Sequence, residues 1–254
     1  MKNLSLFIVS TVFFLSFFAC SGNKENRKAG DTAVNDTVDN TPDSIVRYFS
    51  NQKVLKEVSF KNGVRNGLTK TFYVGGQLYQ TFLYKNDLRE DSSGWYYTEG
   101  QLFRSTPYLH DTIHGIQRQY YRDGKIRARI GYDKGLRTEF FQEFTKDGKL
   151  VKGYPEITIT ATDNYKKKGQ YILTLGFSDN SKNVRFYNGE IIEGKYDTTR
   201  YKSIKTIDGK GTLVLKKTGI EGKNYIGIVG DVTTNLGNRY LTYKKVDLPY
   251  NDLQ

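Results

Sequence analysis

The chain is poor in the residues that build disulfide frameworks and zinc sites. Its 254 residues include one cysteine, two histidines, four prolines and one tryptophan. A lone cysteine cannot form a disulfide within the chain, and a zinc site made of cysteine and histidine alone needs more ligands than the chain contains. Hydrophobic residues make up only 37 %, and 20 residues of the chain are tyrosines. The sequence therefore predicts a thin aliphatic core, with aromatic side chains covering the sheet faces.

The N-terminal segment predicts export. Lys2 precedes an apolar run over residues 4–18, which is shorter than the about 20 residues that a membrane span needs. The run ends at Ala19, followed by Cys20, the single cysteine of the chain. This arrangement resembles a bacterial lipoprotein signal, which implies cleavage after residue 19, a lipid on Cys20 and attachment to a membrane. An ordinary secretory signal and an uncleaved anchor helix are the alternatives.

Residues 20–44 follow the signal as a polar stretch without aromatic side chains. Such a segment cannot bury enough apolar area to offset the entropy lost on ordering, so it predicts a disordered tether. Its expected reach is about 25–30 Å. Ser21 follows the lipid-bearing cysteine, and in the lipoprotein resemblance this implies the outer membrane of the cell envelope.

Residues 45–154 repeat with a period of 24. The spacing appears in three sets of positions: Gly76, Gly100, Gly124 and Gly148; Phe60, Tyr84, Tyr108 and Tyr132; and Leu78, Leu102, Ile126 and Leu150. A fixed period of this size indicates a repeat architecture in which neighbouring units complete one another. Asp123-Gly124 lies between two runs of alternating polarity, which predicts a two-residue turn between antiparallel strands.

These units resemble the bacterial variant of the MORN repeat. The positions that carry the resemblance in one unit are Phe60, Asn62, Gly63, Gly67, Tyr73, Gly76 and Leu78. In a later unit they are Tyr108, Asp111, His114, Gly115, Tyr121, Gly124 and Ile126. The resemblance implies a scaffold for protein or lipid contact, and some members of the family carry an antitoxin label.

The period stops after residue 154, and residues 155–254 predict a separate domain. Seven short runs rich in β-branched and aromatic residues alternate with turn-forming residues such as Asp208-Gly209. This pattern favours a β-sandwich, possibly immunoglobulin-like, with a small barrel as the alternative. The predicted fold class is thus all-β, with tandem 24-residue hairpins followed by a sandwich.

No residue pattern points to catalysis or to a cofactor. His110 and His114 have the spacing of metal ligands on a helix, but they fall in a connector between hairpins, where turn propensity explains them. Asp87, Glu90 and Asp91 likewise replace turn residues of the repeat. The sequence predicts a protein that is not an enzyme and that has neither a metal site nor a cofactor.

The remaining signal is positive charge, with a formal net charge of +12. Export argues against nucleic acid as a partner, whereas acidic lipids and acidic glycans of the envelope attract a cationic surface. A two-residue turn at Asp123-Gly124 would pair three couples across one hairpin and place them on one face. The predicted ligand-binding residues are Arg118 with Arg129, Tyr120 with Arg127, and Arg122 with Lys125.

The sequence thus predicts a non-enzymatic envelope lipoprotein that acts as a binding or scaffold module for a protein or an anionic envelope ligand. Two alternatives stay open at this point. One is a carbohydrate-binding surface lipoprotein that uses aromatic platforms, which the presence of a single tryptophan, Trp95, disfavours, and the other is an antitoxin-like inhibitor of a partner protein.

Overall fold

The computed structural model describes residues 42–254 of the chain. The predicted signal peptide, the predicted lipidation site at Cys20 and most of the predicted tether lie outside the described residues. Contacts group the region Asn40–Gln254 into one compact unit. Within the described region, no helix has the length and apolar character needed to span a membrane.

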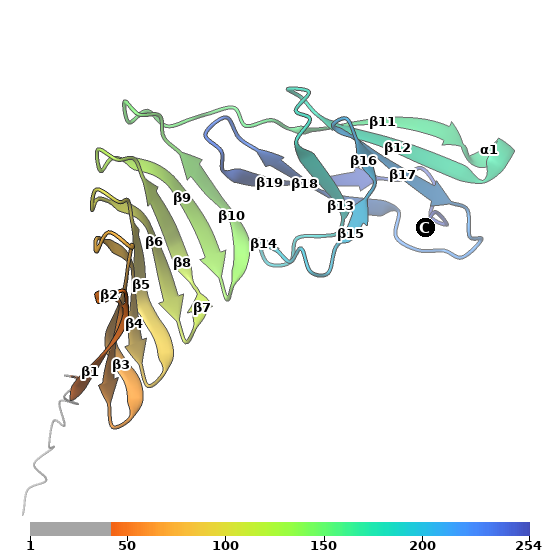
Figure 1. Ribbon diagram of the computed structural model, residues 1–254. Helices are drawn as coiled ribbons and strands as arrows, with labels where there is room; N and C mark the ends of the chain where they lie inside the picture. Colours follow the sequence, from red (N-terminus) through yellow and green to blue (C-terminus); the bar gives the residue numbers. More distant parts are fainter. Residues whose placement is uncertain (1–41) are drawn as a thin grey trace, which may run out of the picture. The chain divides into compact units, whose positions relative to one another are not determined.

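The repeats form one antiparallel sheet in which neighbouring strands follow chain order (Figure 1). Its strands are β1 (Ser44–Ser50), β2 (Lys53–Lys61), β3 (Val64–Phe72), β4 (Leu78–Lys85), β5 (Leu88–Tyr96), β6 (Leu102–Leu109), β8 (Gly115–Tyr120), β9 (Ile126–Asp133) and β10 (Leu136–Glu143). The short strand β7 (Thr112–Ile113) pairs with β6. The prediction of tandem hairpins is confirmed, and they join into a continuous sheet.

Two kinds of turn alternate along this sheet. At the ends near Asn62-Gly63, Asn86-Asp87 and His110-Asp111, both turn residues have positive φ, as a tight two-residue hairpin turn requires. The loops that contain the periodic glycines are longer. Around Gly124, the Tyr121 N–H donates to the Lys125 carbonyl and the Gly124 N–H donates to the Tyr121 carbonyl.

The predicted two-residue turn at Asp123-Gly124 is therefore wrong, because the loop has three residues. Only Gly124 has positive φ, at 83°, while Asp123 keeps an ordinary backbone conformation. A loop of this type ends in a left-handed glycine that forms a bulge. A second irregularity recurs further along the strands of each full repeat, where the pairing register shifts by one residue next to Phe72, Tyr96 and Tyr120.

The period of 24 arises from hydrogen bonds that link each repeat to the next. Tyr73, Tyr97 and Tyr121 donate their hydroxyl protons to the carbonyls of Tyr96, Tyr120 and Phe144, at 2.8, 3.0 and 2.7 Å. At the other ends of the strands, near the two-residue turns, the Nε atoms of Arg65 and Arg89 lie 2.8 Å from carboxylate oxygens of Asp87 and Asp111. Equivalent residues thus repeat because they make equivalent contacts.

Few side chains of the repeat sheet are buried, and several of the buried ones are polar. Val58, Thr69, Ser93 and Thr106 are buried along successive strands, with Ser93 completely inaccessible. The Thr69 and Ser93 hydroxyls have no hydrogen-bond partner among the described residues. This region is therefore stabilised mainly by the strand ladder and by contacts between repeats, as its low aliphatic content predicts.

The C-terminal part is a sandwich of two four-stranded sheets (Figure 1). Their strands are β11 (Ile157–Asn164), β12 (Gln170–Phe177), β13 (Val184–Asn188), β15 (Lys202–Ile204), β16 (Thr206–Ile207), β17 (Lys210–Lys216), β18 (Tyr225–Thr233) and β19 (Arg239–Asp247). One short helix, α1 (Tyr165–Lys168), joins β11 to β12.

The sheet orders are β11-β12-β17-β16 and β15-β13-β18-β19. Apart from β15, this is the strand order of an immunoglobulin-like sandwich. The adjacent short strands β15 and β16 pair with different sheets. Leu173, Leu175, Phe186 and Ile228 from both sheets are at most 1 % exposed, so the two sheets share one hydrophobic core.

Candidate functional site

The last strand of the repeat sheet is covered by the sandwich half of the chain. Strand β14 (Lys195–Tyr196), in the segment between β13 and β15, pairs with β10 through Arg137 and Thr138. Tyr196 is 4 % exposed, and burial raises the pKa of its hydroxyl. The junction between repeats and sandwich is consequently a built interface, and the two main cavities of the described region lie beside it.

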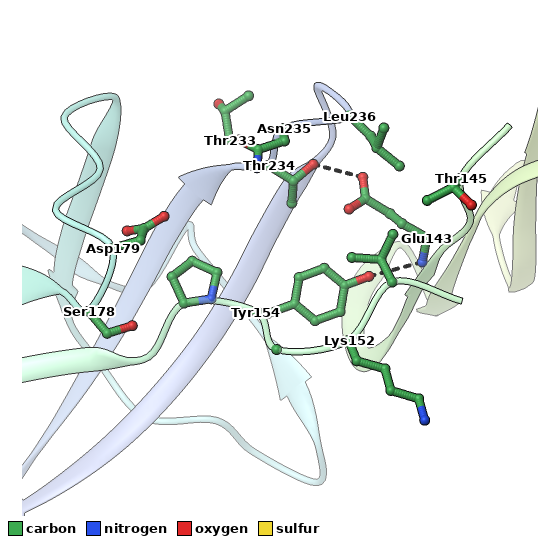
Figure 2. A pocket seen from close by; sticks show the side chains of 13 residues that line it. Glu143, Thr145, Lys152, Tyr154, Ser178, Asp179, Thr233, Thr234, Asn235 and Leu236 are labelled. Carbon is green, nitrogen blue, oxygen red and sulfur yellow. Dashed lines mark hydrogen bonds between the residues drawn. The ribbon is translucent and has the colours of Figure 1, made fainter. Parts of the chain in front are cut away.

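A buried carboxylate fastens this junction. Glu143, at the end of β10, is 1 % exposed. Its Oε1 atom accepts hydrogen bonds from the Thr234 hydroxyl and the Asn238 amide, both at 2.7 Å. Since these donors belong to the loop between β18 and β19, one repeat residue holds a loop of the sandwich. Figure 2 shows the carboxylate pointing to Thr234.

The first cavity, of about 480 Å³, opens beside Glu143 (Figure 2). Its wall includes Tyr154, Asp179 and Leu236. The Tyr154 hydroxyl accepts a hydrogen bond from the Glu143 N–H at 3.0 Å. Burial, followed by the nearby negative charge of Glu143, raises the pKa of Tyr154 to about 12. Tyr154 also stacks on Tyr240 of β19, with 4.7 Å between ring centroids, so the linker from β10 to the sandwich is tightly packed.

Arg127 belongs to this junction as well. Its guanidinium donates a hydrogen bond to the carbonyl of Leu236 in the β18–β19 loop. The equivalent positions in neighbouring repeats hold Tyr79, Phe103 and Val151. The change from an apolar to a charged residue at this position is thus explained by a contact with the sandwich.

The predicted set of six residues is only partly brought together. Arg118 does pair with Arg129 across the hairpin. The other two pairings are wrong, because the three-residue loop and its bulge place Tyr120 opposite Ile126 and Tyr121 opposite Lys125. Sequence alternation missed this shift because Asp-Gly is compatible with either kind of loop.

Most cations of the set already have a partner. Arg122 pairs with Glu99, and the Lys125 ammonium lies 3.2 Å from a carboxylate oxygen of Asp123. The Arg129 guanidinium lies 5.4 Å from the centre of the Phe144 ring. Mutual repulsion therefore does not require an external anion at this face, and anion binding by the set remains a prediction.

A second cavity, of about 500 Å³, lies on another side of the junction and is rich in arginine. Its wall includes Arg137 of β10, Arg185 of β13 and Arg239 of β19. Arg239 is paired with Asp231, whose side chain is 5 % exposed, through both carboxylate oxygens. Burial lowers the pKa of Arg137, and its Nε atom is buried without a hydrogen-bond acceptor among the described residues.

Neither Arg137 nor Arg185 has a carboxylate within ion-pair distance in the described part of the chain. Arg137 donates to the Arg239 carbonyl at 3.2 Å and lies near the rings of Tyr132 and Phe141. Arg185 is exposed and faces Asp231 across the β13–β18 pairing. The sequence analysis missed this group because its members come from three separate segments.

The remaining predicted candidates lie in solvated turns. The imidazoles of His110 and His114 lie 3.5 and 3.1 Å from carboxylate oxygens of Glu90 and Asp133. Asp87 and Asp91 occupy turn or bulge positions with positive φ. Over residues 42–254, no group of three or more histidine, cysteine or acidic side chains has an arrangement that could hold a metal ion.

Comparison with known proteins identifies the repeats. The family described as MORN repeat variant matches residues 113–134, which cover the hairpin turn at Asp123-Gly124 and strands β8 and β9. No curated protein matches the chain. The match covers one unit of the array, and the periodic contacts show that the neighbouring units are built in the same way. A MORN-type repeat suggests a binding or scaffold module.

Proposed function

We propose that the protein is a non-enzymatic binding module of the cell envelope, anchored by lipid on Cys20, and that its arginine cavity holds an anionic group of an envelope glycan. The ligand group is a carboxylate or a phosphate. The repeats and the sandwich serve as the rigid frame that positions the cavity between β10 and the β13–β18–β19 sheet.

The supporting observation is the unmatched charge of Arg137. The Arg137 guanidinium donates to the Arg239 carbonyl, but its Nε atom is buried without an acceptor, so the hydration lost at that atom is not replaced within the described chain. The Nε atoms of Arg104 and Arg129 are also buried without an acceptor, so what distinguishes Arg137 is its place in a cavity with two further arginines. A carboxylate or phosphate oxygen would supply that acceptor, and arginine recognises such planar or tetrahedral anions through two parallel hydrogen bonds. An anion would therefore be attracted to this cavity more strongly than a neutral sugar.

The two aspartates that line the cavity already have arginine partners, so neither neutralises Arg137 or Arg185. Asp231 is occupied by Arg239, and Asp197 lies 2.9 Å from Arg200. Arg185 adds a second cation without a hydrogen-bonded partner, and Thr198 lines the same cavity, whereas the Thr199 hydroxyl already donates to Asp197. The wall thus combines cations with neutral donors, as a binding site for a sugar acid or sugar phosphate requires.

The second candidate function is the binding of a neutral sugar, for which a group of aromatic side chains is the supporting observation. A shallow hollow of about 310 Å³ is lined by aromatic side chains of the first repeats and by Arg104. The Arg104 guanidinium already lies 4.2 Å from the centre of the Trp95 ring, so it covers part of the platform that a sugar would use.

Titration calorimetry with glucuronate, glucose 6-phosphate and glucose separates the two functions. We expect the two anions to bind and glucose to give no heat. Arg137→Gln and Arg185→Gln should each weaken anion binding at least about tenfold, the usual effect of losing a charged hydrogen bond. Lys149→Gln, which removes the same charge from an exposed repeat loop outside the cavity, is the matched control.

Two results would overturn the proposal. One is binding of glucose as tight as that of its phosphate, and the other is unchanged anion binding in both cavity variants. Thermal unfolding of each variant shows whether it is folded, and Arg185, which is exposed, offers a substitution with little structural risk.

A further inference from the structure

The N-terminal edge of the repeat sheet is open and apolar. All seven residues of β1 are exposed, and among residues 42–254 the strand has a neighbouring strand on one side only, β2. Ile45, Val46, Tyr48 and Phe49 are 53, 42, 50 and 61 % exposed. Because side chains alternate along a strand, adjacent positions of this set place apolar groups on both faces of the sheet.

Strand β1 contains no lysine, proline or unpaired charge, although its pairing with β2 shifts register next to Tyr48 and Phe49. Sheet edges that resist further pairing carry lysines, prolines, bulges or inward-pointing charges. The one charged residue in β1 is Arg47, and its Nε atom lies 2.8 Å from a carboxylate oxygen of Glu57 on β2. Asp43 holds the start of the strand, since its N–H donates to the Phe60 carbonyl and its carboxylate accepts from the Asn62 N–H.

We propose that β1 pairs with β1 of a second copy of this chain, in antiparallel orientation, to form a two-fold symmetric dimer. An antiparallel pair of identical strands is self-complementary and closes after two copies. The repeat sheet is antiparallel throughout, so the second copy continues its hydrogen-bonding pattern and its twist. The pairing also covers the apolar side chains on both faces.

Charge favours a second copy at this edge over contact elsewhere. The chain has a net charge of +12, so two copies repel each other over most of their surfaces. In β1 the single positive charge lies beside Glu57, and a further cation is Lys56 of β2, whose ammonium lies 5.9 Å from the centre of the Tyr48 ring. A register that centres the two-fold axis on Tyr48 places Arg47 opposite Phe49 of the second copy and avoids a clash of like charges.

The position of β1 in the chain also suits a dimer. Residues 1–41 precede the strand, so the predicted tethers of both copies begin at the interface. With a reach of about 25–30 Å each, such tethers allow both copies to be anchored in the same bilayer. Pairing itself does not depend on the anchor.

The test is the mass of the full chain in detergent, measured by light scattering. We expect twice the chain mass for the unmodified protein and the single-chain mass for the double variant V46K/F49K. The matched control is V74K/I220K, which adds the same charge at two exposed apolar positions outside β1 and should remain dimeric.

A monomeric unmodified chain at micromolar concentration would overturn the proposal, as would a dimer that survives V46K/F49K. Hydrogen exchange on the unmodified chain provides a second readout that needs no folded variant. The amides of residues 44–50 should become more protected as the protein concentration rises, and protection independent of concentration would contradict the pairing.

Discussion

The two edges of the repeat sheet differ in what covers them. Strand β10 is paired with β14 from the sandwich segment and fastened by Glu143, whereas β1 has no further strand beside it in the described chain. Without a neighbouring strand, either edge would present a row of unpaired backbone groups. The comparison shows that each edge strand of a repeat sheet needs something to cover it. At β10 the covering strand comes from the same chain.

The residues at the covered edge depart from the repeat pattern. Arg127 and Glu143 each contact a sandwich loop, and neither contact has an equivalent in the earlier repeats. Interior repeats instead use the periodic tyrosine and arginine bonds. A break in the period therefore marks a contact with something other than another repeat.

The largest expected effect is at the covered edge. Glu143→Ala should lower the free energy of unfolding by about 3 kcal/mol, because it leaves the buried donors of Thr234 and Asn238 without their acceptor. Urea denaturation measures this loss. Glu139→Ala, an exposed position four residues earlier in β10, should change stability by less than about 0.5 kcal/mol. Equal effects would show that Glu143 does not fasten the junction.

A smaller effect is expected inside the array. Tyr97→Phe removes one hydrogen bond between repeats, from the Tyr97 hydroxyl to the Tyr120 carbonyl, and should cost about 1 kcal/mol. Tyr79→Phe is the control, since no hydrogen bond of the Tyr79 hydroxyl occurs among the described residues. If both variants unfold at the same urea concentration, the tyrosine bonds do not stabilise the array.

The smallest effect concerns the arginine–aspartate contacts between repeats. Hydrogen bonds from the Arg65 side chain and backbone lower the pKa of Asp87 below its ordinary value. A lowered folded-state pKa adds stability above the unfolded pKa, and this stability is lost as the pH falls through the folded value. Asp87→Asn should therefore be less stable than the unmodified chain at neutral pH.

The stability gap between these two proteins should close at low pH, where the unmodified Asp87 is protonated. Melting temperatures measured from neutral pH to strong acid give the comparison. A gap that persists unchanged in acid would mean that the contact stabilises the array without its charge. Added salt should reduce the gap as well, because Asp87 and Arg65 are both substantially exposed.

Local chemistry explains why the array and the sandwich are predictable from sequence. The positions Gly76, Gly100, Gly124 and Gly148 recur because each supplies the positive φ that closes its loop. The periodic Tyr73, Tyr97 and Tyr121 recur because each bonds to the next repeat. The short apolar runs of the C-terminal part likewise carry the strand period of two.

Local sequence patterns could not predict the length of the turn or the contacts of the predicted cations. Asp123-Gly124 fits both a two-residue and a three-residue loop, and one residue of difference changes which side chains face each other. Arg127 and its acceptor Leu236 are 109 positions apart, a separation over which no periodicity applies.

By itself, the sequence determined the all-β class, the 24-residue repeat and the change to a sandwich after residue 154, because these follow from turn residues and local strand patterns. Tertiary structure alone decided that β14 covers β10, that Glu143 is buried against Thr234 and Asn238, and that Arg137 and Arg185 line one cavity. Such contacts join segments far apart in the chain, and their energy comes from burial and charge that exist only once both halves have folded together.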